Sequence, residues 1–207
     1  MTRDPIQQRS RKTMERILAA TERLLRDRPF ERIAVADIVR RAHASIGAFY
    51  ARFEDKEALL PHLYARYDES LHRRFESMIR RYSRARPSRA LLIDRLVRDM
   101  MSRYRARRWF FRAMALYARQ RGDPLGAERR RRRTEMHQAL AQALAAALGT
   151  PGRLCSPRQV EIGLFTVAAA CRDRILFADT PPASSLSVSD EELRRELSAM
   201  LLAYLSG

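Results

Sequence analysis

The sequence predicts an all-α protein, and three observations lead to that fold class. Hydrophobic residues make up 46% of the 207 residues, which is enough to bury a core and excludes a disordered chain. Only 7 residues are glycine, so few of the tight turns that join strands are expected. Apolar residues recur at helical intervals along most of the chain, and no segment alternates as a strand does. We expect about nine helices.

The first 57 residues have the pattern of three short helices. From Arg11 to the break at Pro29, apolar residues fall on one helical face. A second helix is expected over residues 35–42. Ser45 is placed to cap a third helix, whose buried side carries Phe49. Because only a tight turn separates the last two helices, we predict a helix-turn-helix domain preceded by a basic N-terminal arm.

The remainder, residues 58–207, is predicted to form a larger helical domain. Its first helix is long and begins near Leu60, with a kink expected at Pro61. Further helices are expected over about 88–105, 108–121, 125–148, twenty residues from 157, and a last segment from about 190. The breaks between them are marked by proline, glycine or serine.

Charge is the strongest signal in the composition. The formal net charge is +17, and 39 of the 41 basic residues are arginine, since Lys12 and Lys56 are the only lysines. Such a balance favours a polyanionic partner, either nucleic acid or an anionic membrane surface. Arginine also binds phosphates and guanine edges with two hydrogen bonds. A solubilising role for the charge is the alternative explanation.

Several classes of protein are not expected. Cys155 and Cys171 are too few and too far apart for a disulfide framework or a zinc site. No uncharged run approaches the ~18 residues of a membrane span, and the N-terminus has no apolar signal core, so we expect a cytoplasmic protein. The chain also lacks the common catalytic motifs, and we expect no enzyme activity, metal or cofactor.

The third helix combines small and aromatic residues in a way that has two interpretations. The first is close packing inside a helical bundle. The second is a DNA-reading helix, because small side chains let the backbone approach base edges while Tyr50 and Arg52 bind phosphates. Ile46 or Ala48 could then touch a thymine methyl group. The candidate DNA-binding residues are Ser45, Ile46, Gly47, Ala48, Tyr50, Arg52 and Lys56, with Arg11 and Lys12 from the arm.

This segment resembles the tetracycline-repressor (TetR) family of bacterial transcriptional regulators. The matching positions are Phe30, Val35, Ile38, Ala42, Ser45, Gly47, Phe49, Tyr50, Phe53, Lys56 and Leu59. The resemblance implies a homodimer that binds a palindromic double-stranded operator and is released by a small-molecule inducer. The alternative from another class is an arginine-rich helical module that binds an acidic protein or a membrane surface.

Three departures from the family pattern have physical consequences. The glycine of the turn is His43, so a positive φ there would be strained. The threonine that caps the second helix is Ala34, which removes a hydrogen bond worth about 1 kcal/mol, and Asp37 offsets part of that loss. Polar residues early in the third helix are replaced by Ile46 and Ala48, so the operator cannot be copied from relatives.

The resemblance also implies roles for the second domain. The middle helices would surround an inducer cavity for an apolar or amphipathic molecule, although core packing also explains most of these residues. The candidate ligand-binding residues are Met100, Met101, Tyr104, Trp109, Phe110, Met114 and Tyr117, with Arg105 or Arg112 facing an anionic group. The last two helices would form the dimer interface. Its candidate residues are Gly163, Val167, Ala170, Leu193, Leu197, Met200, Leu201 and Tyr204, and packing within the chain explains part of this set.

The arginine run at residues 129–133 invites a nucleic-acid interpretation but lies far from the helix-turn-helix. We interpret it as a solvated helix face. Because positive charge near a helix N-terminus is unfavourable, acidic partners are expected on neighbouring helices.

Overall fold

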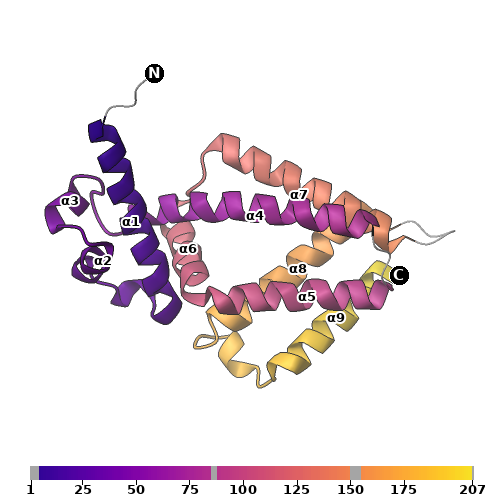
Figure 1. Cartoon of the computed structure of the whole chain (residues 1–207). Coiled ribbons are helices and arrows are strands. Elements are labelled where there is room, and N and C mark those ends of the chain that lie inside the picture. The colour runs from indigo at the N-terminus through magenta and orange to yellow at the C-terminus, as the bar shows by residue number, and fades with distance from the viewer. Residues whose placement is uncertain (1–4, 85–87, 150–154, 207) are drawn as a thin grey trace. The chain divides into compact units, whose positions relative to one another are not determined.

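The computed structural model describes residues 5–84, 88–149 and 155–206, and every regular element within those ranges is helical (Figure 1). The α-helices are α1 (Pro5–Asp27), α2 (Val35–Ala42), α3 (Ile46–Tyr50), α4 (Leu59–Arg84), α5 (Arg89–Ala106), α6 (Arg108–Arg121), α7 (Ala127–Leu148), α8 (Pro157–Leu176) and α9 (Asp190–Ser206). Two short 3-10 helices, η1 (Phe30–Arg32) and η2 (Ala183–Ser185), complete the set. The predicted all-α fold is confirmed.

Two local expectations were wrong. Helix α1 begins at Pro5, before the expected start at Arg11, so Arg11 and Lys12, which were assigned to the N-terminal arm, lie within the helix. Arg3, which was assigned to the same arm, lies outside the described residues. Helix α4 runs without a break through Pro61. Pro61 is the third residue of that helix, where a backbone N–H has no partner within the helix, so its absence costs little.

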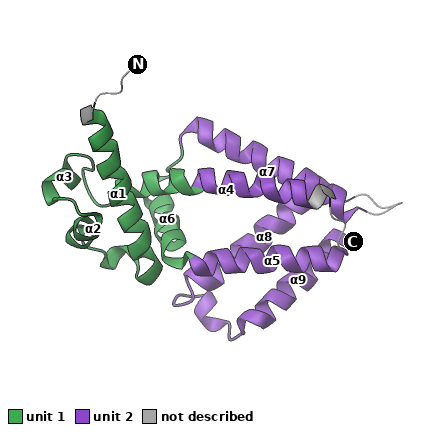
Figure 2. Cartoon of the chain, in the orientation of Figure 1, with its two compact units in different colours: residues 1–67, 107–125 green, residues 68–106, 126–207 purple. Residues whose placement is uncertain are grey.

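The chain divides into two compact units, which Figure 2 distinguishes by colour. Unit 1 comprises residues 1–67 and 107–125, and unit 2 comprises 68–106 and 126–207. This division differs from a simple boundary after residue 57, because α6 packs in unit 1. Phe110 and Met114 of α6 are buried in the same cluster as Ile17 and Leu18 of α1.

Unit 1 holds the helix-turn-helix in a core of its own. Helix α1 contributes buried residues including Ile17, Leu18 and Leu25, and Ile38 of α2 packs with them. Phe49 of α3 is fully buried in the same cluster. Each such side chain stabilises the unit by about 1.5–3 kcal/mol relative to an exposed position. Burial of Phe49 therefore holds α3 against the core of unit 1.

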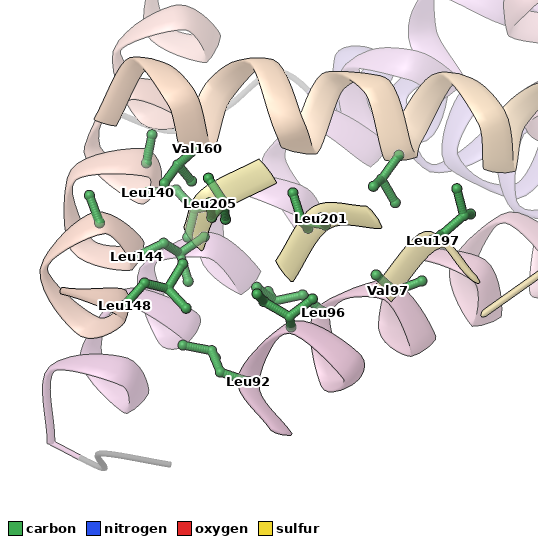
Figure 3. Packing of buried hydrophobic residues seen from close by; sticks show 14 of the residues in the cluster. Leu92, Leu96, Val97, Leu140, Leu144, Leu148, Val160, Leu197, Leu201 and Leu205 are labelled. Atoms are coloured by element: carbon green, nitrogen blue, oxygen red, sulfur yellow. The ribbon is translucent and has the colours of Figure 1, made fainter. Parts of the chain in front are cut away.

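The core of unit 2 is built from leucines spaced at helical intervals (Figure 3). In α7, Leu140, Leu144 and Leu148 fall four residues apart and therefore share one face. Helix α9 repeats the pattern with Leu193, Leu197, Leu201 and Leu205, all of them buried. These faces meet Leu92, Leu96 and Val97 of α5 and Val160 of α8.

The arginine run of α7 has the acidic partners that the sequence suggested. Arg133 binds Asp68 of α4 through Nε at 2.9 Å, and Arg129 lies 3.6 Å from Glu69. Among the residues whose burial the structure describes, Asp68 is the one charged residue that is buried, with 8% of its surface exposed. Part of the run is therefore an interhelical ion-pair network.

Across the described ranges, none of the helices has the length and apolarity that a bilayer crossing requires.

Candidate nucleic-acid interface

The turn between α2 and α3 is held by a left-handed residue. His43 has φ 50° and ψ 50°, so the positive φ that we expected to be strained at this position is present. The Ala44 N–H donates to the carbonyl of Val39 at 2.9 Å, and the His43 N–H donates to that of Arg40 at 3.3 Å. This pair of hydrogen bonds is the Schellman arrangement that ends many helices. The chain thus turns sharply into α3 at the cost of backbone strain.

Ser45 begins α3 as a side-chain cap. Its backbone is extended, with φ −89° and ψ 160°, and its Oγ accepts a hydrogen bond from the Ala48 N–H at 3.1 Å. A serine cap of this kind is worth about 1 kcal/mol. The predicted cap is confirmed, and because it uses a lone pair of the hydroxyl, the O–H proton stays available to a phosphate oxygen.

Aromatic side chains fix the buried side of α3. Phe49 and Phe53 are 0% and 2% exposed, and their ring centroids lie 5.3 Å apart. Phe53 also meets the ring of His62 edge-on at 5.6 Å. Five residues cannot form a stable helix alone, so this packing is what makes α3 a rigid element.

The outward side of α3 carries two large side chains and a glycine. Ile46 and Tyr50 are 55% and 54% exposed, which is unusual for side chains of their size. Gly47 is also exposed, and a Cβ placed on it would meet no atom within 4 Å. Ala48 is half-buried, although an outward position was expected. The face that the sequence assigned to DNA is therefore open to solvent and needs no small residue for internal packing.

The two basic residues that follow α3 are engaged inside unit 1. The Arg52 guanidinium donates to the Ala48 carbonyl at 2.6 Å, to the Ser10 carbonyl at 3.4 Å and to the Ser10 Oγ at 3.2 Å. Lys56 Nζ donates to the Phe30 carbonyl at 3.1 Å and lies 4.6 Å from the centre of the Phe30 ring. Both side chains tie α3 and the following turn to α1 and η1, a role that the sequence did not suggest.

The start of α2 lacks a side-chain cap, as Ala34 led us to expect. Asp37 lies in the first turn and forms ion pairs with Arg28 at 2.9 Å and Arg40 at 2.5 Å. Its carboxylate is also near the positive end of the helix dipole, which stabilises a helix start by a fraction of a kcal/mol.

The predicted ligand-binding residues belong to two different clusters. Met100, Met101 and Tyr104 lie in unit 2, where Met101 is buried in the core. The other four lie in unit 1, where Phe110 and Met114 are buried. Trp109 and Tyr117 are half-buried at the edge of that cluster. The seven residues are therefore not gathered in one core.

The predicted dimer residues divide by exposure. Most are used inside unit 2: Gly163, Val167, Leu193, Leu197 and Leu201 are buried, and Ala170 packs partly against the same core. A Cβ on Gly163 would lie 2.5 Å from the Leu201 Cδ1, so α8 and α9 pack closely at this point. Met200 and Tyr204 are 59% and 43% exposed.

Two exposed residues of α8 were missed by the sequence reasoning. Ile162 is 43% exposed and Phe165 is 70% exposed. Helical periodicity could have identified them, because both fall on the face of α8 that is opposite Val160 and Val167. A large aromatic residue on that face points away from the core.

Comparison with known proteins agrees with this geometry. Residues 17–63 match the sequence model of the family described as bacterial regulatory proteins, tetR family. No protein of curated function matches the chain. A candidate TetR-family transcriptional regulator from Mesorhizobium loti is 18% identical, with a TM-score of 0.63 over 96% of this chain and 97% of that one.

Two further solved structures share the fold. The transcriptional regulator FadR from Bacillus subtilis, solved in complex with stearoyl-CoA, is 16% identical, with a TM-score of 0.53 over 93% of this chain and 98% of its own. Reduced NemR from Escherichia coli is 16% identical, with a TM-score of 0.55 over 91% and 94% of the two chains.

The helical fold and the capped, exposed α3 define a helix-turn-helix protein of the kind that binds DNA. Its helix-turn-helix domain belongs to the tetR family of bacterial regulatory proteins, and the chain as a whole has the fold of that family's transcriptional regulators. The resemblance seen in the sequence is confirmed.

Proposed function

We propose that this protein is a cytoplasmic, homodimeric repressor that binds a palindromic operator and is released by an apolar or amphipathic small molecule. The observation that carries the proposal is the outward face of α3, where Ile46, Gly47 and Tyr50 are exposed on a helix held rigidly from beneath. In helix-turn-helix proteins the second helix of the motif, here α3, is the element that enters the major groove.

Each α3 of the dimer would occupy one half-site, with the two half-sites about one helical turn, ~34 Å, apart. The hydroxyl groups of Ser45 and Tyr50 would donate to phosphate oxygens. Arg11 and Lys12, exposed on α1, would add charge near the backbone of the duplex. Because phosphate contacts release counterions, affinity should fall steeply as salt rises.

Selection from a pool of random duplexes tests this proposal. Enrichment of a palindrome supports the regulator. Salt-sensitive binding without any enriched sequence would instead favour the alternative, an arginine-rich module for acidic proteins or membrane surfaces, and would refute operator recognition.

The exposed apolar residues of α8 and α9 support dimerisation. Ile162 and Phe165 lie one turn apart on α8, and Met200 and Tyr204 lie one turn apart on α9. A Cβ on Gly163 would lie 3.4 Å from the Tyr204 ring, which places that ring beside α8. An apolar surface shared by two neighbouring helices suits a two-fold four-helix interface.

Light scattering at micromolar concentration tests the dimer. We expect a dimer for the native chain and a monomer for Phe165→Glu, because a carboxylate at the interface would be buried without a partner. Leu91→Glu is the control, since Leu91 is also an exposed apolar residue, at 43%, but lies on α5. A native monomer, or a Phe165→Glu dimer, would count against this interface.

The ligand proposal is tested by thermal shift. Stearoyl-CoA is a suitable first probe because it is amphipathic and occupies FadR of Bacillus subtilis. Tyr104→Ala and Tyr117→Ala probe unit 2 and unit 1 separately, since the two tyrosines lie in different units. Loss of the shift in one variant would locate the ligand. If no apolar or anionic compound stabilises the native protein, the ligand proposal fails.

Release of DNA requires a difference in affinity between two states. The inducer must bind a state with poor operator affinity more tightly than it binds the operator-bound state. By linkage, the operator must then weaken inducer binding by the same factor. Equal inducer affinity with and without operator would exclude this mechanism.

A further inference from the structure

The outward face of α3 offers DNA an unusual chemistry. Ile46 and Tyr50 lie four residues apart and so share one face of the helix, with exposed Gly47 beside them. The first large side chain on this face, that of Ile46, is aliphatic. More than half of Ile46 is in contact with solvent, so the free protein gains little from its hydrophobicity.

Three polar side chains that flank α3 already have partners within unit 1. Arg52 is held by Ser10 and the Ala48 carbonyl, and Lys56 is held by the Phe30 carbonyl. Ser45 Oγ accepts from the Ala48 N–H. Helix α3 itself therefore presents no side-chain amide, carboxylate or guanidinium group to a base edge. Its one side-chain donor is the Tyr50 hydroxyl, and the cap residue Ser45 adds a second hydroxyl.

The space in front of Gly47 lets a duplex come close. Because a Cβ at this position would meet no atom within 4 Å, the backbone of α3 is uncovered there. A close approach brings the neighbouring Ile46 side chain against the floor of the major groove. The one apolar group that base pairs display in that groove is the 5-methyl group of thymine.

We infer that Ile46 recognises a thymine methyl group at one fixed position of each operator half-site, so that specificity at that position is apolar and not hydrogen-bonded. This inference rests on the proposed operator binding and names the chemistry of that site. Thymine is therefore preferred at the position that faces Ile46, because adenine, guanine and cytosine lack the methyl group.

Replacement of thymine by uracil in the selected operator isolates the methyl group, because uracil keeps the same hydrogen-bonding edge. At one position per half-site, we expect native affinity to fall about fourfold per methyl, the factor for one methylene-sized apolar group. Both half-sites together should lose about sixteenfold.

The variant Ile46→Ala should bind the thymine operator more weakly and should not distinguish it from the uracil operator at that position. Tyr50→Phe is the control, and it should keep the full sensitivity to uracil because Ile46 is intact. Ile46 is exposed, so its replacement leaves the core of unit 1 unchanged.

The possible results separate the inference from the function on which it rests. An enriched palindrome with no uracil-sensitive position, or with the same sensitivity in Ile46→Ala, overturns the inference while operator binding stands. No enriched sequence overturns both. A sensitive position that is lost only in Ile46→Ala establishes apolar readout.

Discussion

Substitution of Gly47 separates the two interpretations of the small residues in α3, because they predict opposite effects. If Gly47 serves internal packing, Gly47→Ala should destabilise the protein. If it serves approach to DNA, the same change should leave the fold intact and weaken binding. Gly47 lies in a helix without a positive φ, and the space before it is empty, so alanine fits without strain.

The size of each effect follows from this geometry. Alanine is favoured over glycine inside a helix by roughly 0.5–1 kcal/mol, and no clash reduces that gain in the free protein. In the complex, the added methyl group would occupy space that the duplex fills. Overpacking of that kind costs about 1–3 kcal/mol, and a dimer has the position twice. Operator affinity should therefore fall by about thirtyfold or more.

Urea unfolding gives the stability, and fluorescence anisotropy on the selected operator gives the affinity. Gly126→Ala is the control, because Gly126 also has empty space before it but lies at the start of α7. It should leave operator affinity unchanged. A Gly47→Ala variant that is less stable than the native protein, or that binds the operator equally well, would refute the reasoning.

Three further predictions concern stability. His43→Gly should stabilise the protein by roughly 0.5–1 kcal/mol in urea unfolding, because relief of left-handed strain of about 1–2 kcal/mol exceeds the entropy that glycine loses; no gain would mean that His43 is not strained. Asp68→Asn should lower the free energy of unfolding by about 3 kcal/mol, because it leaves the Arg133 guanidinium without its largely buried carboxylate. Glu69→Gln, in an exposed pair, should lower it by less than about 1 kcal/mol. Equal losses in the two variants would contradict this prediction. Burial raises the pKa of Cys171 from 9.0 to about 11, so the folded state keeps a proton that the unfolded state releases, and this stabilisation of about 2–3 kcal/mol should be lost as pH rises from 9 to 11. The stability of native protein relative to Cys171→Ala, measured across that range, should therefore decline, and a constant difference would exclude the effect.

Local pattern was sufficient to predict much of the helix-turn-helix. The bounds of α2, the cap by Ser45 and the buried Phe49 all follow from residues close together in sequence. The sequence also identified His43 as the turn residue at which a positive φ would be strained, and that conformation is present. These features depend on backbone geometry and helical periodicity, which a single segment contains.

Contacts between distant segments could not be predicted in the same way. Arg52 meets Ser10 across 42 positions, and Lys56 meets the Phe30 carbonyl across 26. Both residues were assigned to DNA binding because an exposed basic residue and an internally bonded one look alike in sequence. Only the packing of α1 against α3 distinguishes them.

Unit 2 shows the same limit for apolar residues. Helical periodicity identifies which residues share a face but not what covers that face. Leu197 and Leu201 of α9 are buried in the core of unit 2. Phe165 of α8 lies on the side of that helix that faces away from this core, and it stays exposed. The resemblance assigned the buried set to a dimer interface, and periodicity could not show that these residues pack within the unit.

The most direct test of the account is the affinity of the native protein and Tyr50→Phe for the selected operator and for a scrambled duplex of equal length. The phenylalanine keeps the edge-on ring contact with Phe49 at 5.2 Å and removes only the hydroxyl group. We predict that native protein prefers the operator by at least about a thousandfold, and that Tyr50→Phe binds it about tenfold more weakly per half-site. Equal native affinity for the two duplexes would contradict recognition of an operator through α3.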